Sequence, residues 1–148
     1  MNTKEQLESA LKTAMKAGDD LSKRTLRMAL SAIRLTEIDK GVTLDEAGVQ
    51  AILQKEVKSR QEAIVDAQRA HRPDLEAAAQ AEIHLLERFM PKQLSAAEMD
   101  ELARQAINET GATSLKEMGA VMKVLMPRLQ GRASGDQASQ AVKRLLGG

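Results

Sequence analysis

The 148-residue sequence contains no cysteine, tryptophan or tyrosine, and its single aromatic residue is Phe89. Without cysteine the chain cannot form disulfides, thiolate metal sites or thiol nucleophiles, and this composition suits a reducing compartment. Modules that read single-stranded RNA stack the bases on several aromatic rings, which this chain does not have. Any contact with RNA is therefore expected to involve the RNA backbone and its shape.

Long apolar runs and an excess of one charge are also absent. The 22 Lys and Arg residues nearly balance the 21 Asp and Glu residues, which argues against general polyanion binding but not against a local basic patch. No apolar run approaches the roughly 20 residues of a membrane span, and the first residues lack the pattern of a secretory signal. We therefore expect a cytoplasmic protein that has no membrane partner.

Consecutive helices explain the pattern of polar and apolar residues. Apolar side chains recur with the period of a helix, and no alternating run is long enough for a strand. Gly119 lies within one of the predicted helices, where glycine costs about 1 kcal/mol relative to Ala, and this predicts a close helix crossing or a close backbone approach there. Capping-box spacing begins at Thr3, Thr43, Ser95, Ser114 and Ser134. The sequence predicts an all-α fold with helices near residues 3–17, 20–39, 44–70, 73–90, 95–109, 114–126 and 134–146.

Pro91 marks a boundary between two parts of the chain. Proline lacks a backbone N–H and disfavours helical geometry at the preceding residue, so the fourth helix is expected to end there. We predict an N-terminal helical bundle over residues 1–91 and a small C-terminal three-helix domain over residues 92–148.

The second predicted helix has two apolar stripes and a basic face. One stripe passes through Leu26 and Ile33 and the other through Met28 and Leu35, which predicts a helix packed between neighbours on both sides. The basic residues of this helix have no acid among them, and they either contact phosphate or form an ordinary solvated face. They are Lys23, Arg24, Arg27 and Arg34.

Motifs for catalysis and for metal binding are missing. The sequence has no nucleophile elbow, phosphate loop or His-Glu-x-x-His pair. His71 and His84 have no third ligand at the spacing of a metal site. We therefore expect no catalytic residues, no metal and no cofactor.

Arg60, on the third predicted helix, is a candidate binding residue. It lies within the apolar sector of that helix, and Glu56 lies one turn earlier at the edge of the same sector. In one interpretation the guanidinium is held for a partner or an anion, so that Glu56 and Arg60 form a partner-binding site. In the other, Arg60 forms an interhelical ion pair or packs its stem while its head reaches solvent.

The last two predicted helices are basic for their size, because residues 115–148 contain six positive and two negative side chains. The segment from Gly131 to Gly135 precedes the last helix, where unpaired N–H groups can receive a phosphate oxygen. A plain capped loop is the alternative. The candidate nucleic-acid-binding residues are Lys123, Arg132, Lys143 and Arg144 for phosphate contact, with Gly131 and Gly135 allowing close backbone approach.

Several motifs follow one another along the chain. They are KEVKSRQE at 55–62, RPDL at 72–75, MPKQLS at 90–95, MGAVMK at 118–123, GRASG at 131–135 and VKRLL at 142–146. By these motifs the sequence resembles the YqeY family over nearly its whole length. The C-terminal half of that family is similar to the tail domain of the B subunit of bacterial aminoacyl-tRNA amidotransferase, which is associated with tRNA recognition.

This resemblance implies binding rather than catalysis, because the kinase and amide-transfer sites of the amidotransferase cradle have no counterpart here. Glu117 and Ser134 stand where the family usually has aspartate. The leading hypothesis is a non-catalytic helical adaptor that binds tRNA, or a tRNA-handling enzyme, through its C-terminal domain. The alternatives are an accessory part of a glutamine-dependent amidotransferase, a carbon–nitrogen ligase with glutamine as amido donor, and a protein–protein adaptor that does not bind RNA.

Overall fold

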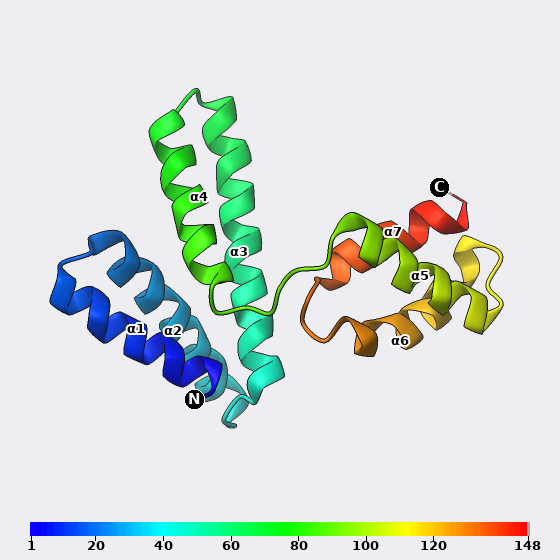
Figure 1. Cartoon of the computed structure of the whole chain (residues 1–148), viewed down its shortest axis with the longest axis horizontal. Coiled ribbons are helices and arrows are strands. Elements are labelled where there is room, and N and C mark those ends of the chain that lie inside the picture. Colours follow the sequence, from blue (N-terminus) through cyan, green and yellow to red (C-terminus); the bar gives the residue numbers. More distant parts are fainter. Residues whose placement is uncertain (148) are drawn as a thin grey trace. The chain divides into compact units, whose positions relative to one another are not determined.

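The computed structural model describes residues 1–147, and within this range every regular element is helical (Figure 1). The all-α prediction is thus confirmed. The chain divides into two compact units, Met1–Pro91 and Lys92–Gly148. The helices are α1 (Thr3–Ala17), α2 (Asp20–Lys40), α3 (Glu46–Arg69), α4 (Pro73–Glu87), α5 (Ala96–Thr110), α6 (Met118–Leu129) and α7 (Gly135–Leu146), with a 3-10 turn, η1 (Leu115–Glu117), before α6.

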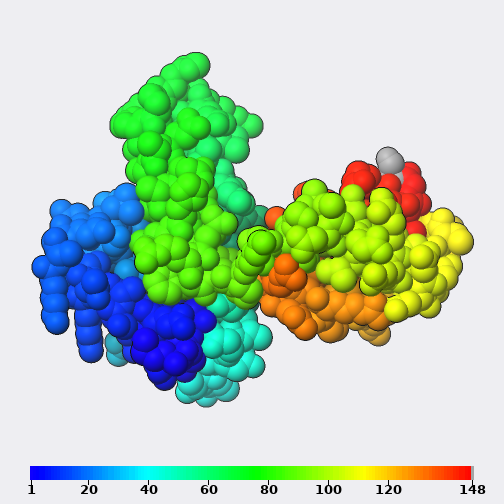
Figure 2. All heavy atoms as spheres, viewed as in Figure 1, coloured from blue at the N-terminus to red at the C-terminus, as the bar shows by residue number. Residues whose placement is uncertain are grey.

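Two helical hairpins, α1–α2 and α3–α4, form the N-terminal unit (Figure 1). Each fully buried leucine or isoleucine in their shared core contributes roughly 1.5–3 kcal/mol. The end of the α3–α4 hairpin at which the two helices are connected extends beyond α1 and α2 (Figure 2). Small buried residues such as Ala67 and Ala79 lie between α3 and α4. The largest side chains of this core that are fully buried are Leu7, Leu26, Ile33, Leu53 and Leu86.

The C-terminal unit is formed by α5, α6 and α7, and each of these helices packs against the other two. Its core combines small residues of α5, among them Ala103 and Ala106, with larger ones of α6 and α7, among them Val121, Leu125 and Val142. Alanine at these positions of α5 lets the backbones approach closely.

Several helices begin directly after the residue whose side chain caps best among the neighbouring candidates. Ser95 and Ser134 form the predicted capping boxes. At α1 and α3, however, Asn2 and Asp45 are the caps rather than Thr3 and Thr43, because amide and carboxylate oxygens cap better than a threonine hydroxyl. The predicted box at Ser114 does not form, since its side chain makes no capping hydrogen bond and the carboxylate of Glu117 accepts from the N–H of Thr113 instead.

The prediction that α2 packs between neighbours on both sides is wrong. Leu26 and Ile33 are buried, whereas Met28 and Leu35 of the second stripe are 50% and 60% exposed. Within the N-terminal unit α1, α3 and α4 all pack against α2, and the apolar side chains that they bury lie on one face of it. The opposite face of α2 remains at the surface.

Two features of α6 differ from expectation. The helix continues through Pro127 to Leu129, beyond the predicted end at residue 126. Burial of Leu129, which is 1% exposed, offsets the hydrogen bond that the proline cannot donate. At Gly119, nothing lies within 4 Å of the place that a Cβ would occupy, so the predicted close helix crossing is absent.

Candidate nucleic-acid interface

Arg132 holds the segment that leads into the C-terminal unit. Its Nε donates to the carbonyl oxygen of Lys92 at 2.9 Å, and its Nη2 lies 3.1 Å from Oε2 of Glu98. Its own carbonyl oxygen accepts from the N–H of Leu94 at 2.9 Å. The guanidinium proposed from the sequence as a phosphate contact is thus engaged by intramolecular partners.

Glu98 stays ionised at neutral pH and keeps Arg132 paired. It occupies the third position of α5, where the hydroxyl of Ser95 accepts from its N–H and its carboxylate accepts from the N–H of Ser95. Hydrogen bonds from the side chain and backbone of Ser95, and then from Arg132, lower the pKa of Glu98 below its ordinary value of 4.5. The cap of α5 and the arginine contact therefore depend on one carboxylate.

Two further arginines pair with acids of α5. Arg144 of α7 forms an ion pair with Asp100, and Arg128 of α6 forms one with Glu109. Helix α5 carries four acids and one arginine, so it balances much of the positive charge that the sequence concentrates in residues 115–148. These arginines connect α6 and α7 to α5 at the surface, outside the apolar core of the unit.

Unlike these arginines, three lysines of the C-terminal unit are exposed and unpaired within the described residues. Lys116, Lys123 and Lys143 are exposed, and in the part of the chain that the structure describes none of them forms an ion pair. On α6, Lys123 points away from the side that carries the buried Val121 and Leu125. Lys116 is not among the candidate residues predicted from the sequence, although it is one of the six positive side chains of residues 115–148 and the charge excess there could have identified it.

The loop before α7 is a capped turn. Gly131 has a φ of +75°, in the left-handed region that favours glycine. A Cβ at Gly135 would lie 3.6 Å from Cε of Met126, an ordinary contact, so nothing in the packing requires glycine there. The side chain of Ser134 accepts from the N–H of Gln137 and thereby occupies one of the free N–H groups at the start of α7. These contacts favour the plain capped loop over the anion site.

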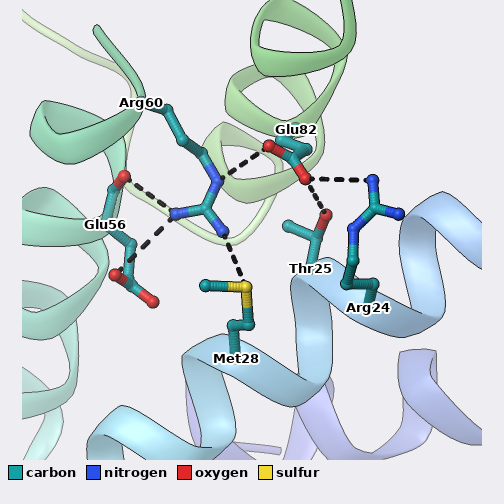
Figure 3. A network of polar contacts seen from close by, with 6 residues as sticks. All are labelled: Arg24, Thr25, Met28, Glu56, Arg60 and Glu82. Carbon is teal, nitrogen blue, oxygen red and sulfur yellow. Dashed lines mark hydrogen bonds and ion pairs between the residues drawn. The ribbon is translucent and has the colours of Figure 1, made fainter. Parts of the chain in front are cut away.

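In the N-terminal unit, Arg60 lies in a polar network among α2, α3 and α4 (Figure 3). Its Nε is 3.3 Å from Oε2 of Glu82 on α4. Its Nη1 donates to the carbonyl oxygen of Glu56 at 3.0 Å and lies 3.8 Å from that residue's carboxylate. Its Nη2 lies 3.8 Å from the sulfur of Met28 on α2.

Glu82 connects the three helices of this network. Besides Arg60 it contacts Arg24 and the hydroxyl of Thr25, both at 3.4 Å and both from α2. The Nε of Arg60 is at ion-pair distance from Glu82, but its N–H does not point at the carboxylate closely enough for a hydrogen bond. With 7% of its side chain exposed, Arg60 offers a partner almost no surface, which favours the ion-pair interpretation over the partner-binding one.

Groups that could carry other chemistry are few. Among residues 1–147, no three His, Cys, Asp or Glu side chains are arranged to hold a metal ion. The Nε2 of His84 lies 3.2 Å from the side-chain nitrogen of Gln80. No helix in the described range combines the length and the apolar character needed to cross a membrane.

These features describe an all-α protein whose C-terminal unit has an apolar core, arginine–carboxylate pairs at its surface and lysines exposed to solvent. The model of the Yqey-like protein family matches residues 4–146. The chain therefore belongs to the YqeY family, in agreement with its ordered motifs.

The chain is also similar to curated fungal proteins named "Altered inheritance of mitochondria protein 41, mitochondrial". The protein from Vanderwaltozyma polyspora is 36% identical over 85 residues, which cover 57% of this chain and 46% of the relative. The one from Eremothecium gossypii is 37% identical over 101 residues, with coverages of 68% and 55%. The one from Pyrenophora tritici-repentis is 28% identical over 148 residues, with coverages of 96% and 80%. The chain spans about half the length of the first of these relatives.

The names of these relatives contradict the expected cytoplasmic localisation. They are described as mitochondrial proteins, which points away from the cytoplasm. The expectation rested on the lack of cysteine and of a secretory signal. Neither feature distinguishes the cytosol from another compartment that keeps thiols reduced.

Proposed function

We propose that this YqeY-family chain is a non-catalytic helical adaptor that binds the phosphate backbone of tRNA through its C-terminal unit. The observation that carries the proposal is that the three lysines of residues 115–148, Lys116, Lys123 and Lys143, are exposed and form no ion pair with any residue that the structure describes. A lysine that neutralises a phosphate releases condensed counterions, which supplies affinity without reading the base sequence.

The residue types of the unit fit backbone recognition. The one aromatic residue of the chain, Phe89, lies outside the C-terminal unit, so this unit has no ring on which to stack an unpaired base. The lysine ammonium group is a flexible point charge, which suits contacts with phosphates whose positions vary. The resemblance of the C-terminal half to the amidotransferase tail supports tRNA as the RNA that is bound.

In this proposal the arginines act indirectly. Arg132 and Arg144 pair with Glu98 and Asp100 of α5, so these carboxylates already partly compensate the charge of both arginines. We therefore assign the phosphate contacts to Lys116, Lys123 and Lys143 and no longer to Arg132 and Arg144. Gly131 contributes the turn before α7.

The proposal is tested with the full chain, with tRNA as ligand and a duplex RNA of similar length as competitor. The variant Lys116→Gln/Lys123→Gln/Lys143→Gln should bind tRNA at least about tenfold more weakly near physiological salt, because three phosphate contacts are lost. Its control is Lys12→Gln/Lys16→Gln/Lys55→Gln, which removes three exposed lysines from the N-terminal unit and should bind like the wild type.

Other outcomes identify the alternatives. Binding to tRNA that is no tighter than binding to the duplex would overturn the proposal and leave a protein–protein adaptor. A requirement for this chain in glutamine-dependent conversion of Glu-tRNA or Asp-tRNA would instead support an accessory part of an amidotransferase.

A further inference from the structure

The exposed face of α2 carries arginines and apolar side chains in one continuous stripe. Its members lie three or four residues apart, so they share one side of the helix over about 21 Å. Met28, Leu35 and Ile38 are 50%, 60% and 66% exposed. We define the α2 stripe as Arg24, Arg27, Met28, Ser31, Arg34, Leu35 and Ile38, all of them exposed.

The N-terminal unit does not use this stripe as part of its core. The opposite side of α2 already provides its contribution to the core through Leu26, Ala29 and Ile33, each at most 1% exposed. Large apolar side chains that gather on a soluble surface mark an interaction site more often than single exposed ones do. The stripe is therefore available to another molecule.

The charge of the stripe has one sign. It contains three arginines and no acid, and in the described part of the chain neither Arg27 nor Arg34 takes part in an ion pair. The Nη2 of Arg27 lies 3.9 Å from the sulfur of Met15 on α1. Among the described residues, Arg24 is the arginine of the stripe that forms an ion pair, with Glu82 at 3.4 Å.

We propose that the α2 stripe binds an amphipathic helix of a partner protein that presents aspartate or glutamate beside apolar side chains. Arginine and methionine are enriched at protein interfaces, and the planar guanidinium pairs with a carboxylate through two hydrogen bonds. A helix laid along the stripe places its own i, i+3 and i+4 positions against these residues. This surface belongs to the N-terminal unit and does not depend on tRNA binding by the C-terminal unit.

The apolar residues of the α2 stripe favour an acidic protein helix over other anionic ligands. A phosphate backbone would pair with the arginines but would leave Leu35 and Ile38 exposed to water. Helices that lie on anionic membranes separate a lysine-rich polar face from an apolar face that often contains aromatic residues. In the α2 stripe the arginines and the apolar residues are interspersed on one face, and this arrangement matches a mixed acidic and apolar helix.

A display library of 16-residue helices tests the proposal on the full chain. The library fixes apolar residues at i, i+3, i+4 and i+7 and leaves the flanking positions free among Asp, Glu, Lys, Arg and Ser. Selection on the wild type should enrich Asp and Glu. The selected helices should bind Arg27→Glu/Arg34→Glu at least tenfold more weakly, and the same helices with Lys in place of Glu should recover binding to that variant.

Two further variants separate the contribution of apolar contact from that of charge. Leu35→Ser/Ile38→Ser should also weaken binding, because apolar contact is lost without a change in charge. The control Lys12→Glu/Lys55→Glu has the same change of charge at exposed positions of α1 and α3 and should bind the helices like the wild type.

Several results would overturn the proposal. They are a selection without enrichment of acids, helices that bind Arg27→Glu/Arg34→Glu unchanged, or a chain that dimerises through the stripe in sedimentation analysis. The proposal is also wrong if tRNA or anionic phosphatidylglycerol vesicles, and not the helices, lose binding in that variant.

Discussion

Replacing Glu82 with Gln removes the charge that compensates Arg60 in the N-terminal unit. The two side chains are 15% and 7% exposed, and their closest charged atoms are 3.3 Å apart. Loss of one partner from a buried ion pair costs roughly 3–5 kcal/mol because the other charge stays desolvated. Since Glu56 remains within 3.8 Å of Arg60, we expect the lower end, a loss of about 3 kcal/mol in the free energy of unfolding.

Urea unfolding followed by circular dichroism at pH 7 measures this loss. With slopes of about 1–3 kcal/mol per molar urea, the midpoint should fall by about 1–3 M. The double variant Arg60→Met/Glu82→Leu removes both charges and fills a similar volume, so its stability should return to within about 1 kcal/mol of the wild type. Glu87→Gln, at an exposed carboxylate of the same helix, should change stability by less than about 0.5 kcal/mol.

A loss below about 1 kcal/mol for Glu82→Gln would contradict this prediction, because an ion pair whose removal costs so little stability is one that remains solvated. The Arg60 guanidinium would then not depend on Glu82. In that case the interpretation of Glu56 and Arg60 as a partner-binding site would regain support.

Three other predictions follow from single residues. The contribution of Glu98 to stability should be fully present above pH 4.5 and should be lost as the pH falls through its lowered folded-state pKa, so the wild type and Glu98→Gln should converge in unfolding experiments below that range. Gly119→Ala should raise the free energy of unfolding by about 0.5–1 kcal/mol, because open space surrounds the position; a destabilised variant would reveal a close contact. His71, with φ +55°, should be replaced by Gly with a gain of about 1 kcal/mol, and a lower melting temperature would contradict this.

Helix positions could be predicted from the sequence because their signals are local. The C-caps Gly18, Gly41 and Gly111 adopt the left-handed conformation that glycine allows, and Pro73 occupies the first turn of α4. Where two capping residues were close in the sequence, as with Asp45 and Thr43, spacing alone did not decide between them.

The candidate sites were harder to predict because they depend on contacts between distant residues. Glu82 lies 22 positions after Arg60, and no helical period indicates that α3 and α4 bring the two together. The pairing of Arg144 with Asp100 likewise requires α7 to pack against α5. The two apolar stripes of α2 are equivalent in sequence, and only the packing shows that Met28 and Leu35 stay exposed.

The salt dependence of tRNA binding tests the central proposal most directly. Each phosphate contact contributes about −0.7 to −0.9 to the slope of log affinity against log salt. Contacts by Lys116, Lys123 and Lys143 therefore account for about −2 to −2.7, a loss of roughly 20- to 40-fold in affinity between about 50 and 200 mM salt. We expect the triple glutamine variant to lose this part of the slope, and an unchanged slope would contradict phosphate contact by these lysines.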